Sequence, residues 1–512
     1  MPEPVEPGRN GAHELAGQWV RDPQGADTLR RGVVGALGVL SQAVSQIGPT
    51  GSVAVGMGLI AVVAGNGGWL SWALALPVFL LAGFCFSELS KRYSTTGGLP
   101  HLIARVSDPR VGFPIGVLIA FFGIVFQPFL LILVSRYVQN FINLIGVPGG
   151  RWLIVAGALV GSIVPAYLVY KDVRLAADFM IGTEMVAVSL IIFLLVVVLV
   201  NHHGGLLDHA QLDMRGASLH TVILGAVFSC LTFLGFESSI TFGQEAANPK
   251  RSIPFSLYGT LIGGGVLFII AMYVMTLGFA GYAHTSLATS ADPLQGLTKL
   301  YGVGWLNYPL QGAVVIALLA VMVATLNFSA RMVYTYAREG LLPKPLECVG
   351  KETKTPVNAV LAIFLFTNLV FWIMFAIGKN TLAEFARVSS ALTLMYLIAY
   401  IIALIAIAGW MGREHPAVGI AAVLAAAGFG YITYNTLSPS PAPPQNIYNY
   451  LALGLTAVTL VGAGLLAYAR PKVVRRFGLT TDADTALADL TVRERELGLP
   501  LDDSAAVNVI PT

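Results

Sequence analysis

Residues 228–254 are FSCLTFLGFESSITFGQEAANPKRSIP, and this stretch determines how we interpret the remaining sequence. It starts as an apolar membrane segment, reaches Gly235, where a helix should be interrupted, and continues with the carboxylate of Glu237. A glycine and an ionisable group at bilayer depth are costly unless they line a site. We expect a basic loop bounded by proline at residues 248–254. The stretch is therefore interpreted as half of a substrate site whose other half lies near Gly48.

The composition indicates a membrane protein. Of the 512 residues, 56% are hydrophobic and 11% are charged, whereas soluble domains carry about 25% charged residues. The apolar residues form runs of about 20 or more, long enough to cross about 30 Å of hydrocarbon. We predict an all-α, multi-pass protein of the cytoplasmic membrane, in contact with the lipid bilayer.

Several other classes of protein find no support in the sequence. The net charge of +3 and the lack of a basic patch interleaved with aromatic residues argue against nucleic-acid binding. The three cysteines neither cluster nor show metal-ligand spacing, so we expect neither a metal site nor a cofactor. There is no catalytic Ser/His/Asp cluster and no nucleotide-binding loop, so we do not expect an enzyme.

We predict twelve membrane spans. They cover residues 33–63, 69–90, 112–142, 151–170, 177–200, 218–243, 254–281, 308–336, 357–378, 384–410, 416–436 and 448–469. Most of the 30 Lys and Arg residues then fall on one side, which predicts that both termini are cytoplasmic. An interfacial element is expected within residues 91–111, and a short helix around 483–497.

The spans suggest a division into four parts. We expect residues 1–31 to form a cytoplasmic N-terminal segment and residues 32–410 to form a membrane core built from two repeats, roughly 32–201 and 218–410. Two extra C-terminal helices, 11 and 12, lie within 411–470, and residues 471–512 form a cytoplasmic tail.

The first span contains an interruption of its own, in the run Ser45-Gln46-Ile47-Gly48-Pro49-Thr50-Gly51-Ser52. A proline inside a helix removes a backbone hydrogen bond and costs about 3 kcal/mol, and each glycine adds up to about 1 kcal/mol. In lipid, the freed backbone groups need a ligand, an ion or a neighbouring helix.

The two interruptions are five spans apart, in spans one and six. Spans 1–5 start on the inside and spans 6–10 on the outside, so the two halves would be inverted repeats. Paired interruptions at corresponding positions of two halves are the best sequence indication of a transporter site. Gly and Pro also occur in membrane helices as packing notches or kinks, and for either interruption alone that interpretation stays open.

The geometry of broken helices indicates the substrate. Free N–H groups at the start of a half-helix favour an anion, and free carbonyls at the end of a half-helix accept from an ammonium group. A site with both suits a zwitterion, so we expect an amino acid. The predicted substrate-binding residues are Gln46, Ile47, Gly48, Pro49, Thr50, Gly51 and Ser52 from span one, and Phe233, Leu234, Gly235 and Phe236 from span six.

Three motifs resemble the amino acid–polyamine–organocation (APC) family of permeases over roughly residues 33–410. They are FLGFESSITFGQEAANPKRSIP, SELSKRYSTTGG and ARMVYTYAREGLLPK. The resemblance implies a 5+5 inverted-repeat (LeuT-like, or APC) fold with discontinuous helices 1 and 6, alternating access, and amino acids or amines as substrates. One motif departs from the family. Many members have Ile-Gly-Ser-Gly in the first helix, where this sequence has Ile47-Gly48-Pro49-Thr50-Gly51-Ser52, so the register of the carboxylate-binding amides is open by one position.

Four further residues are candidates for coupling or gating. Glu184 in span five could bind a proton, or it could be a neutral carboxyl bonded to a neighbouring helix. The resemblance implicates a glutamate in the place of Glu237 in proton sensing or gating. Thr325 and Ser329 share a helix face and would suit sodium, although bonding to the carbonyl four residues earlier is the commoner role and is favoured here.

The sequence thus predicts a secondary active transporter of an amino acid, with protons as the coupling ion and sodium as a less favoured choice. A polyamine or amine transporter, an amino acid exchanger and a nutrient sensor that does not transport are the alternatives. The side chain of the substrate stays open, as does the choice between a monomer and a homodimer.

Overall fold

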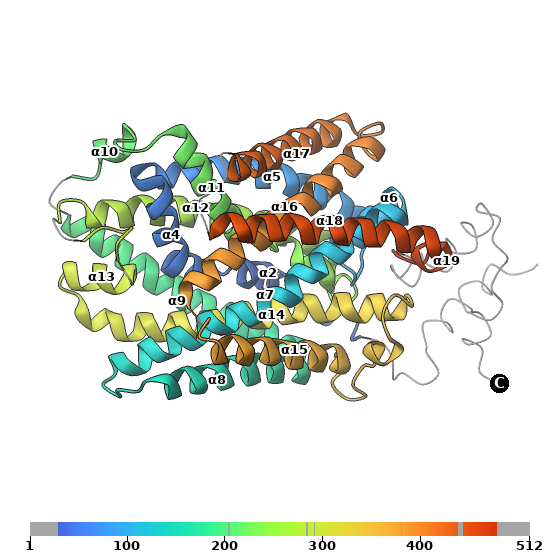
Figure 1. Ribbon diagram of the computed structural model, residues 1–512, viewed down its shortest axis with the longest axis horizontal. Coiled ribbons are helices and arrows are strands. Elements are labelled where there is room, and N and C mark those ends of the chain that lie inside the picture. Colours follow the sequence, from blue (N-terminus) through green and yellow to red (C-terminus); the bar gives the residue numbers. More distant parts are fainter. Residues whose placement is uncertain are drawn as a thin grey trace, which may run out of the picture.

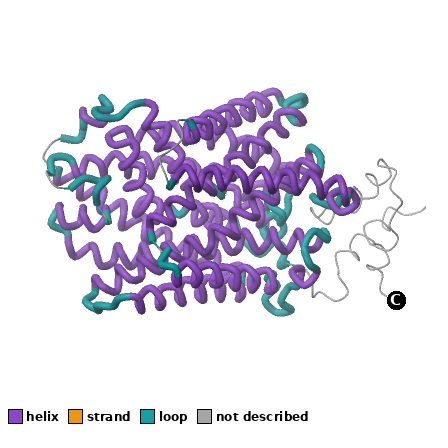
Figure 2. Tube along the Cα trace, in the orientation of Figure 1, coloured by secondary structure: helices purple, strands orange, loops and turns teal. Residues whose placement is uncertain are grey.

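The computed structural model describes residues 29–202, 205–282, 285–290, 292–379, 381–438 and 444–478. Within these ranges the chain consists of helices and loops (Figure 2). An isolated bridge joins Val34 to Ala246. Eleven stretches are long and apolar enough to cross a membrane. They are Ala36–Arg92, Pro109–Leu144, Arg151–Lys171, Val173–Asn201, Leu219–Phe242, Pro249–Phe279, Gly304–Arg338, Val357–Ala376, Leu382–Trp410, Pro416–Leu437 and Gln445–Ala469. The chain is therefore an all-α, multi-pass membrane protein.

The helices that make up these stretches are labelled in chain order in Figure 1. They are α2 (Ala36–Ile47), α3 (Pro49–Gly51), η1 (Ser52–Gly56), α4 (Met57–Ala64), η2 (Gly65–Gly67), α5 (Gly68–Arg92), α7 (Pro109–Leu144), α8 (Arg151–Lys171), α9 (Val173–Asn201), α11 (Leu219–Phe233), η3 (Phe236–Phe242), α12 (Pro249–Phe279), η4 (Gly304–Leu306), α14 (Asn307–Arg338), α15 (Val357–Ala376), α16 (Leu382–Trp410), α17 (Pro416–Leu437) and α18 (Gln445–Ala469).

Five short helices lie between or after these stretches. They are α6 (Leu99–Val106), α10 (His209–Leu212), α13 (Pro293–Leu300), η5 (Lys344–Glu347) and α19 (Pro471–Val474). The helix α6 occupies the segment where an interfacial element was predicted. The helix expected around residues 483–497 lies outside the described residues, as does most of the 1–31 segment.

Local sequence signals explain where several helices begin. The side chains of Asp108 and Asp172 accept hydrogen bonds from backbone N–H groups two residues later, at the starts of α7 and α9. Ser218 and Thr221 form a reciprocal capping box at the start of α11. Each cap supplies an acceptor for an N–H group that has no partner within its own helix.

One predicted loop is helical instead. Residues 248–254 were expected to form a basic loop, but α12 begins at Pro249 and includes Pro254. Proline is well suited to the first position of a helix, because the N–H group that it lacks would have no partner there and its fixed φ already matches the helix. The segment therefore begins a membrane helix and is not a loop before it.

Burial separates a central group of helices from peripheral ones. In the most apolar window of the stretch that contains α14, 94% of the residues are buried, against 22% for α18. Both helices are strongly apolar, but their burial differs. The helix α14 therefore has neighbours on all sides, whereas α18 presents most of its surface to lipid. Figure 1 shows α14 and α7 running through the bundle.

One end of the bundle carries α6 and α19, at the right of Figure 1, and we call it the α6–α19 end. The chain enters there. Val34 N donates to Glu245 O at 2.8 Å, and Ala247 N donates to Val34 O at 2.9 Å. The segment before α2 is thereby tied to the segment that follows η3.

Candidate functional site

The first membrane helix is interrupted at Gly48. The helix α2 ends at Ile47, Gly48 takes the left-handed conformation with φ +52°, and Pro49 starts the short helix α3. A Cβ atom on Gly48 would lie 2.7 Å from Val321 Cγ2 of α14, so a larger residue would have no room there. Proline can start a helix without losing a bond. The interruption predicted from the sequence is thus present, between Gly48 and Pro49.

The second interruption lies at Gly235. The helix α11 ends at Phe233, Gly235 adopts φ +85°, and a 3-10 helix, η3, follows from Phe236. A Cβ atom on Gly235 would lie 2.4 Å from Gln46 Cγ. Gly235 therefore provides the left-handed backbone that the interruption needs, and it lets the two interruptions touch.

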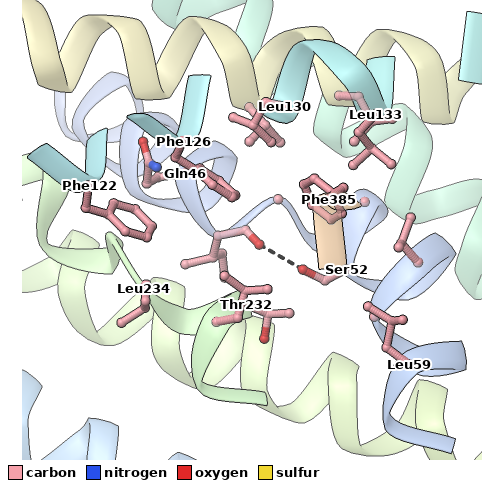
Figure 3. A pocket seen from close by; sticks show the side chains of 18 residues that line it. Gln46, Ser52, Leu59, Phe122, Phe126, Leu130, Leu133, Thr232, Leu234 and Phe385 are labelled. Atoms are coloured by element: carbon pink, nitrogen blue, oxygen red, sulfur yellow. Dashed lines mark hydrogen bonds between the residues drawn. The ribbon is translucent and has the colours of Figure 1, made fainter. Parts of the chain in front are cut away.

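Both interruptions border one cavity of about 80 Å³. Six of the predicted binding residues line it, namely Gln46, Ile47, Gly48, Gly51, Ser52 and Leu234. Figure 3 shows Gln46 and Ser52 at different sides of this cavity, with Thr232 and Leu234 of the second interruption below them in the view. The hydroxyl of Ser52 donates to the carbonyl of Ile47 at 3.0 Å and so bridges the first interruption.

Five predicted binding residues are not part of this lining. They are Pro49, Thr50, Phe233, Gly235 and Phe236. The rings of Phe233 and Phe236 pack against Phe79 of α5, with centroid separations of 5.0 and 5.9 Å. Their side chains support the interruption from outside the cavity.

Most of the apolar lining was not predicted. It comes from α7, α14 and α16 and from residues near the two interruptions: Val55, Gly56, Leu59, Phe122, Phe126, Leu130, Leu133, Leu231, Thr232, Leu318, Val321 and Phe385. Three of these rings, Phe122, Phe126 and Phe385, are labelled in Figure 3. They are apolar residues within apolar helices, so no local signal distinguishes them from residues that face lipid.

The family model described as "Amino acid permease" matches residues 38–416, which is most of the chain and includes both interruptions. The chain belongs to the amino acid permease family.

Curated relatives of this permease are transporters. It is 25% identical over 303 residues to the low-affinity putrescine importer PlaP of Escherichia coli (strain K12), a match that covers 57% of this chain and 64% of the importer. It is 25% identical over 365 residues to the aspartate-proton symporter of Bacillus subtilis (strain 168), covering 66% of each chain. For human cationic amino acid transporter 4 the identity is 25% over 364 residues, which is 67% of this chain and 55% of the relative. The permease thus spans less than two thirds of the length of each of these relatives.

Glu184 of α9 contacts the first interruption through Thr50. Its side chain is buried, and its Oε2 atom accepts a hydrogen bond of 2.9 Å from the hydroxyl of Thr50. Its Oε1 atom is buried without a hydrogen-bond partner among the described residues. A buried oxygen with no donor is costly when it is ionised, and such groups often mark proton or ion sites in membranes.

Glu237 links the second interruption to α16. It is the second residue of η3, it is buried, and the hydroxyls of Tyr396 and Tyr400 both donate to its carboxylate. The two tyrosines are four residues apart, so they lie on the same face of α16. Glu237 does not line the cavity. Its contacts place it between two helices, where a change in its protonation would alter how η3 packs on α16.

Thr325 and Ser329 of α14 lie near the first interruption without lining the cavity. The hydroxyl of Thr325 donates to the carbonyl of Val321 at 2.8 Å and accepts from Gln46 Nε2 at 3.1 Å. Thr325 therefore bonds four residues back, which is the commoner role favoured from the sequence. The hydroxyl of Ser329 is buried without a partner in the described part of the chain, and it lies 2.4 Å from where a Cβ on Gly123 of α7 would be.

The three sequence motifs of the permease meet at the α6–α19 end. Arg331 of the third motif is bonded to Glu245 of the first, through Nε–Oε2 at 2.5 Å and Nη2–Oε1 at 3.0 Å. Both side chains are fully buried, and the guanidinium carbon lies 4.5 Å from the centre of the Phe242 ring. Thr96 of the second motif shares a hydrogen bond of 3.0 Å with Thr335. The pairing of Arg331 with Glu245 was not predicted, because motif resemblance identifies residues without their partners.

Proposed function

We propose that this permease is a secondary active transporter that carries an amino acid across the cytoplasmic membrane by alternating access, coupled to protons. The observation that carries the proposal is the meeting of two interrupted helices at one cavity. The second half of the first helix starts beside this cavity, at Pro49, and α11 ends beside it, at Phe233, although neither of these two residues lines it.

The two helix ends have opposite character. The first N–H groups of a helix and its last carbonyls have no partners within the helix, and the helix dipole adds partial positive charge at the start and negative charge at the end. In this permease Gly51 and Ser52 border the cavity from a helix start, and Thr232 and Leu234 border it from a helix end. Because Ser52 N already donates to Gly48 O at 2.8 Å, an α-carboxylate suits the N–H group of Gly51, and an α-ammonium group suits the second pair.

Gln46 offers a further acceptor for the ammonium group. Its side chain lines the cavity, and its Oε1 atom is buried with no hydrogen-bond partner among the described residues. Its Nε2 atom is held by Thr325, which fixes the direction of the amide. A substrate ammonium group would satisfy the oxygen that is otherwise unpaired.

The lining favours an amino acid with an uncharged, apolar side chain. The wall away from the helix ends is formed by rings and aliphatic groups, such as Phe126, Leu130, Leu133 and Phe385. No charged residue is found in the lining within the described chain. A cationic side chain or a polyamine would enter without a counter-charge, and burying an unpaired ion costs several kcal/mol.

The proposed architecture has twelve crossings arranged as inverted repeats. The Ala36–Arg92 stretch has 57 residues, too many for one crossing of about 30 Å at 1.5 Å per residue, and Gly65 with φ +51° divides it. Counting two crossings there gives twelve, with repeats over roughly 32–201 and 218–410 and two extra helices after them. The α6–α19 end would then be cytoplasmic, in agreement with the distribution of Lys and Arg.

We assign proton coupling to Glu184. It touches the first interruption through Thr50, so protonation of the carboxylate would act directly on the helix start that binds substrate. The variant Glu184→Gln keeps the shape and the acceptor for Thr50 but cannot exchange a proton. It should lose accumulation driven by a pH gradient while it retains exchange of labelled for unlabelled substrate. If Glu184→Gln still accumulates substrate in response to the gradient, Glu184 is not the coupling residue.

The central test is uptake into proteoliposomes under imposed pH or sodium gradients. Neutral apolar amino acids such as leucine or valine should accumulate when the outside is made acidic, and a sodium gradient alone should not drive them. Charged amino acids serve as matched controls of similar backbone. Absence of uptake for every amino acid tested would overturn the proposal.

An amine transporter is the second candidate, favoured by the similarity to a putrescine importer. The same proteoliposomes distinguish the two. Putrescine lacks a carboxylate, so it would leave the helix start at Gly51 and Ser52 without its anion. Accumulation of putrescine, with no uptake of amino acids, would select this alternative.

A further inference from the structure

The segment after the last membrane helix ends in a buried aromatic ring. Phe477 follows α19 and is 1% exposed, although it lies beyond the region matched by the family model. Its ring centre is 4.3 Å from that of His101, 5.4 Å from Tyr336 and 5.6 Å from Phe113. These three side chains come from α6, α14 and α7, so Phe477 packs where three helices meet.

Glycines at two positions make this contact possible. A Cβ on Gly116 of α7 would lie 2.8 Å from the Phe477 ring and 2.6 Å from the Tyr336 hydroxyl. Gly478 has φ +86°, and a Cβ there would lie 2.8 Å from the Cβ of Ala104. Any larger residue at either place would push the segment out, so Phe477 and Gly478 fit a socket of defined shape.

A polar contact fastens the same segment to α6 and to the residue that follows α14. Gly478 N donates to Glu339 Oε1 at 3.1 Å. The carboxylate of Glu339 also contacts His101 Nε2 of α6, at 3.0 and 3.1 Å. Glu339 and His101 are both buried, so the C-terminal segment completes the hydrogen bonding of a buried pair.

The socket is continuous with the contacts that close this end of the bundle. Arg331, Thr335 and Glu339 are spaced four residues apart and so lie along one side of α14 and its end. Arg331 holds Glu245 after η3, and Thr335 holds the loop before α6. Glu339 holds α6 and the C-terminal segment. One row of side chains thus joins the exit of the interrupted helix to Phe477 and Gly478.

We propose that Phe477 and Gly478 form a latch that holds the α6–α19 end of the transporter closed, so that this end opens when the segment leaves its socket. The inference rests on the proposed alternating access, in which η3 and α14 must separate at this end. It goes further by giving control of that step to the C-terminal segment. Docking of the ring stabilises only the closed arrangement, because the socket exists only while α6, α7 and α14 are together.

The latch can be tested with a cysteine reporter at Ser94. This residue is buried beside the end of η3, where a Cβ on Gly243 would lie 3.0 Å from the Ser94 carbonyl carbon. The full chain carries Ser94→Cys together with Cys348→Ser, which removes the exposed natural cysteine. The rate of modification by a water-soluble thiol reagent then reports how often this end opens.

The variants Phe477→Ala and Gly478→Ala should each raise the labelling rate at position 94 about tenfold or more, the factor that corresponds to about 1.4 kcal/mol. Lys472→Ala, an exposed position on α19, is the matched control and should leave the rate unchanged. A second reporter, Thr298→Cys in the buried part of α13 at the opposite end, should not become more reactive.

Unchanged labelling at position 94 in both latch variants would overturn the proposal. Faster labelling at positions 94 and 298 together would also overturn it, because the segment would then stabilise the whole fold and not one end. The labelling needs no substrate. A failure of amino acid uptake with a positive labelling result would therefore reject the proposed substrate and leave the latch in place.

Discussion

Replacing Gly235 with alanine tests whether contact between the two interruptions is needed for function. Alanine at φ +85° costs about 1–2 kcal/mol, because the left-handed conformation brings Cβ too close to the following carbonyl. The new Cβ would also lie 2.4 Å from Gln46 Cγ and must displace that side chain. Moving Gln46 breaks its bond to Thr325, worth about 1 kcal/mol. The expected total is about 2–3 kcal/mol.

The two parts of this cost can be separated with a second variant. In a Gln46→Ala background, Gly235→Ala meets no side chain at Gln46 Cγ and should cost only the backbone part, about 1–2 kcal/mol. Thermal unfolding and initial uptake rates are measured for the wild type, the two single variants and the double variant. The coupling between the two sites should be about 1 kcal/mol.

The matched control is Gly263→Ala in α12. Gly263 has no positive φ, and a Cβ there would meet nothing within 4 Å, so this change should leave stability equal or slightly higher. The reasoning would be refuted if Gly235→Ala were as stable and as active as the control. Equal losses in both Gln46 backgrounds would show that the two interruptions do not press on one another at this point.

Three further predictions follow from other groups. Arg331→Met should lower stability by about 3–5 kcal/mol in thermal unfolding, because Glu245 stays buried without its partner. Adding Glu245→Gln should recover most of this loss. No recovery would contradict the idea that the buried charge of Glu245 causes the loss. Burial raises the pKa of Asp292, which caps α13, so the folded protein should lose stability as the pH rises from the usual aspartate pKa through the raised one. Asp292→Asn keeps the cap and should remove this dependence of stability on pH. An unchanged pH profile of stability would show that Asp292 is not its source. Glu237→Gln should flatten the pH dependence of uptake while the protein stays folded, and an unaltered profile would exclude Glu237 from proton sensing.

Local signals in the sequence predicted most of the membrane helices and the two interruptions. The lengths of the apolar runs identified the membrane helices, because a bilayer of about 30 Å requires about 20 apolar residues. Gly48-Pro49 and Gly235 marked the interruptions, because the backbone cost of proline and left-handed glycine acts within a few residues. The same local reasoning was wrong for residues 248–254, where a proline that was interpreted as the boundary of a loop starts a helix.

The cavity wall and the partners of the buried charges depended on tertiary structure. A membrane helix that is apolar all round, such as α7, gives no sequence signal for which face turns inward. Phe126 and Leu130 line the cavity through the rotation of α7 about its axis, and that rotation is set by its neighbours.

The sequence by itself therefore determined the class of the protein, most of its membrane helices and the places where two helices break, since each depends on interactions between near neighbours in the chain. Only the tertiary structure joined Thr50 to Glu184, Arg331 to Glu245 and Phe477 to its socket. These partners are 134, 86 and 376 residues apart in the sequence, and packing in three dimensions decides which distant groups meet.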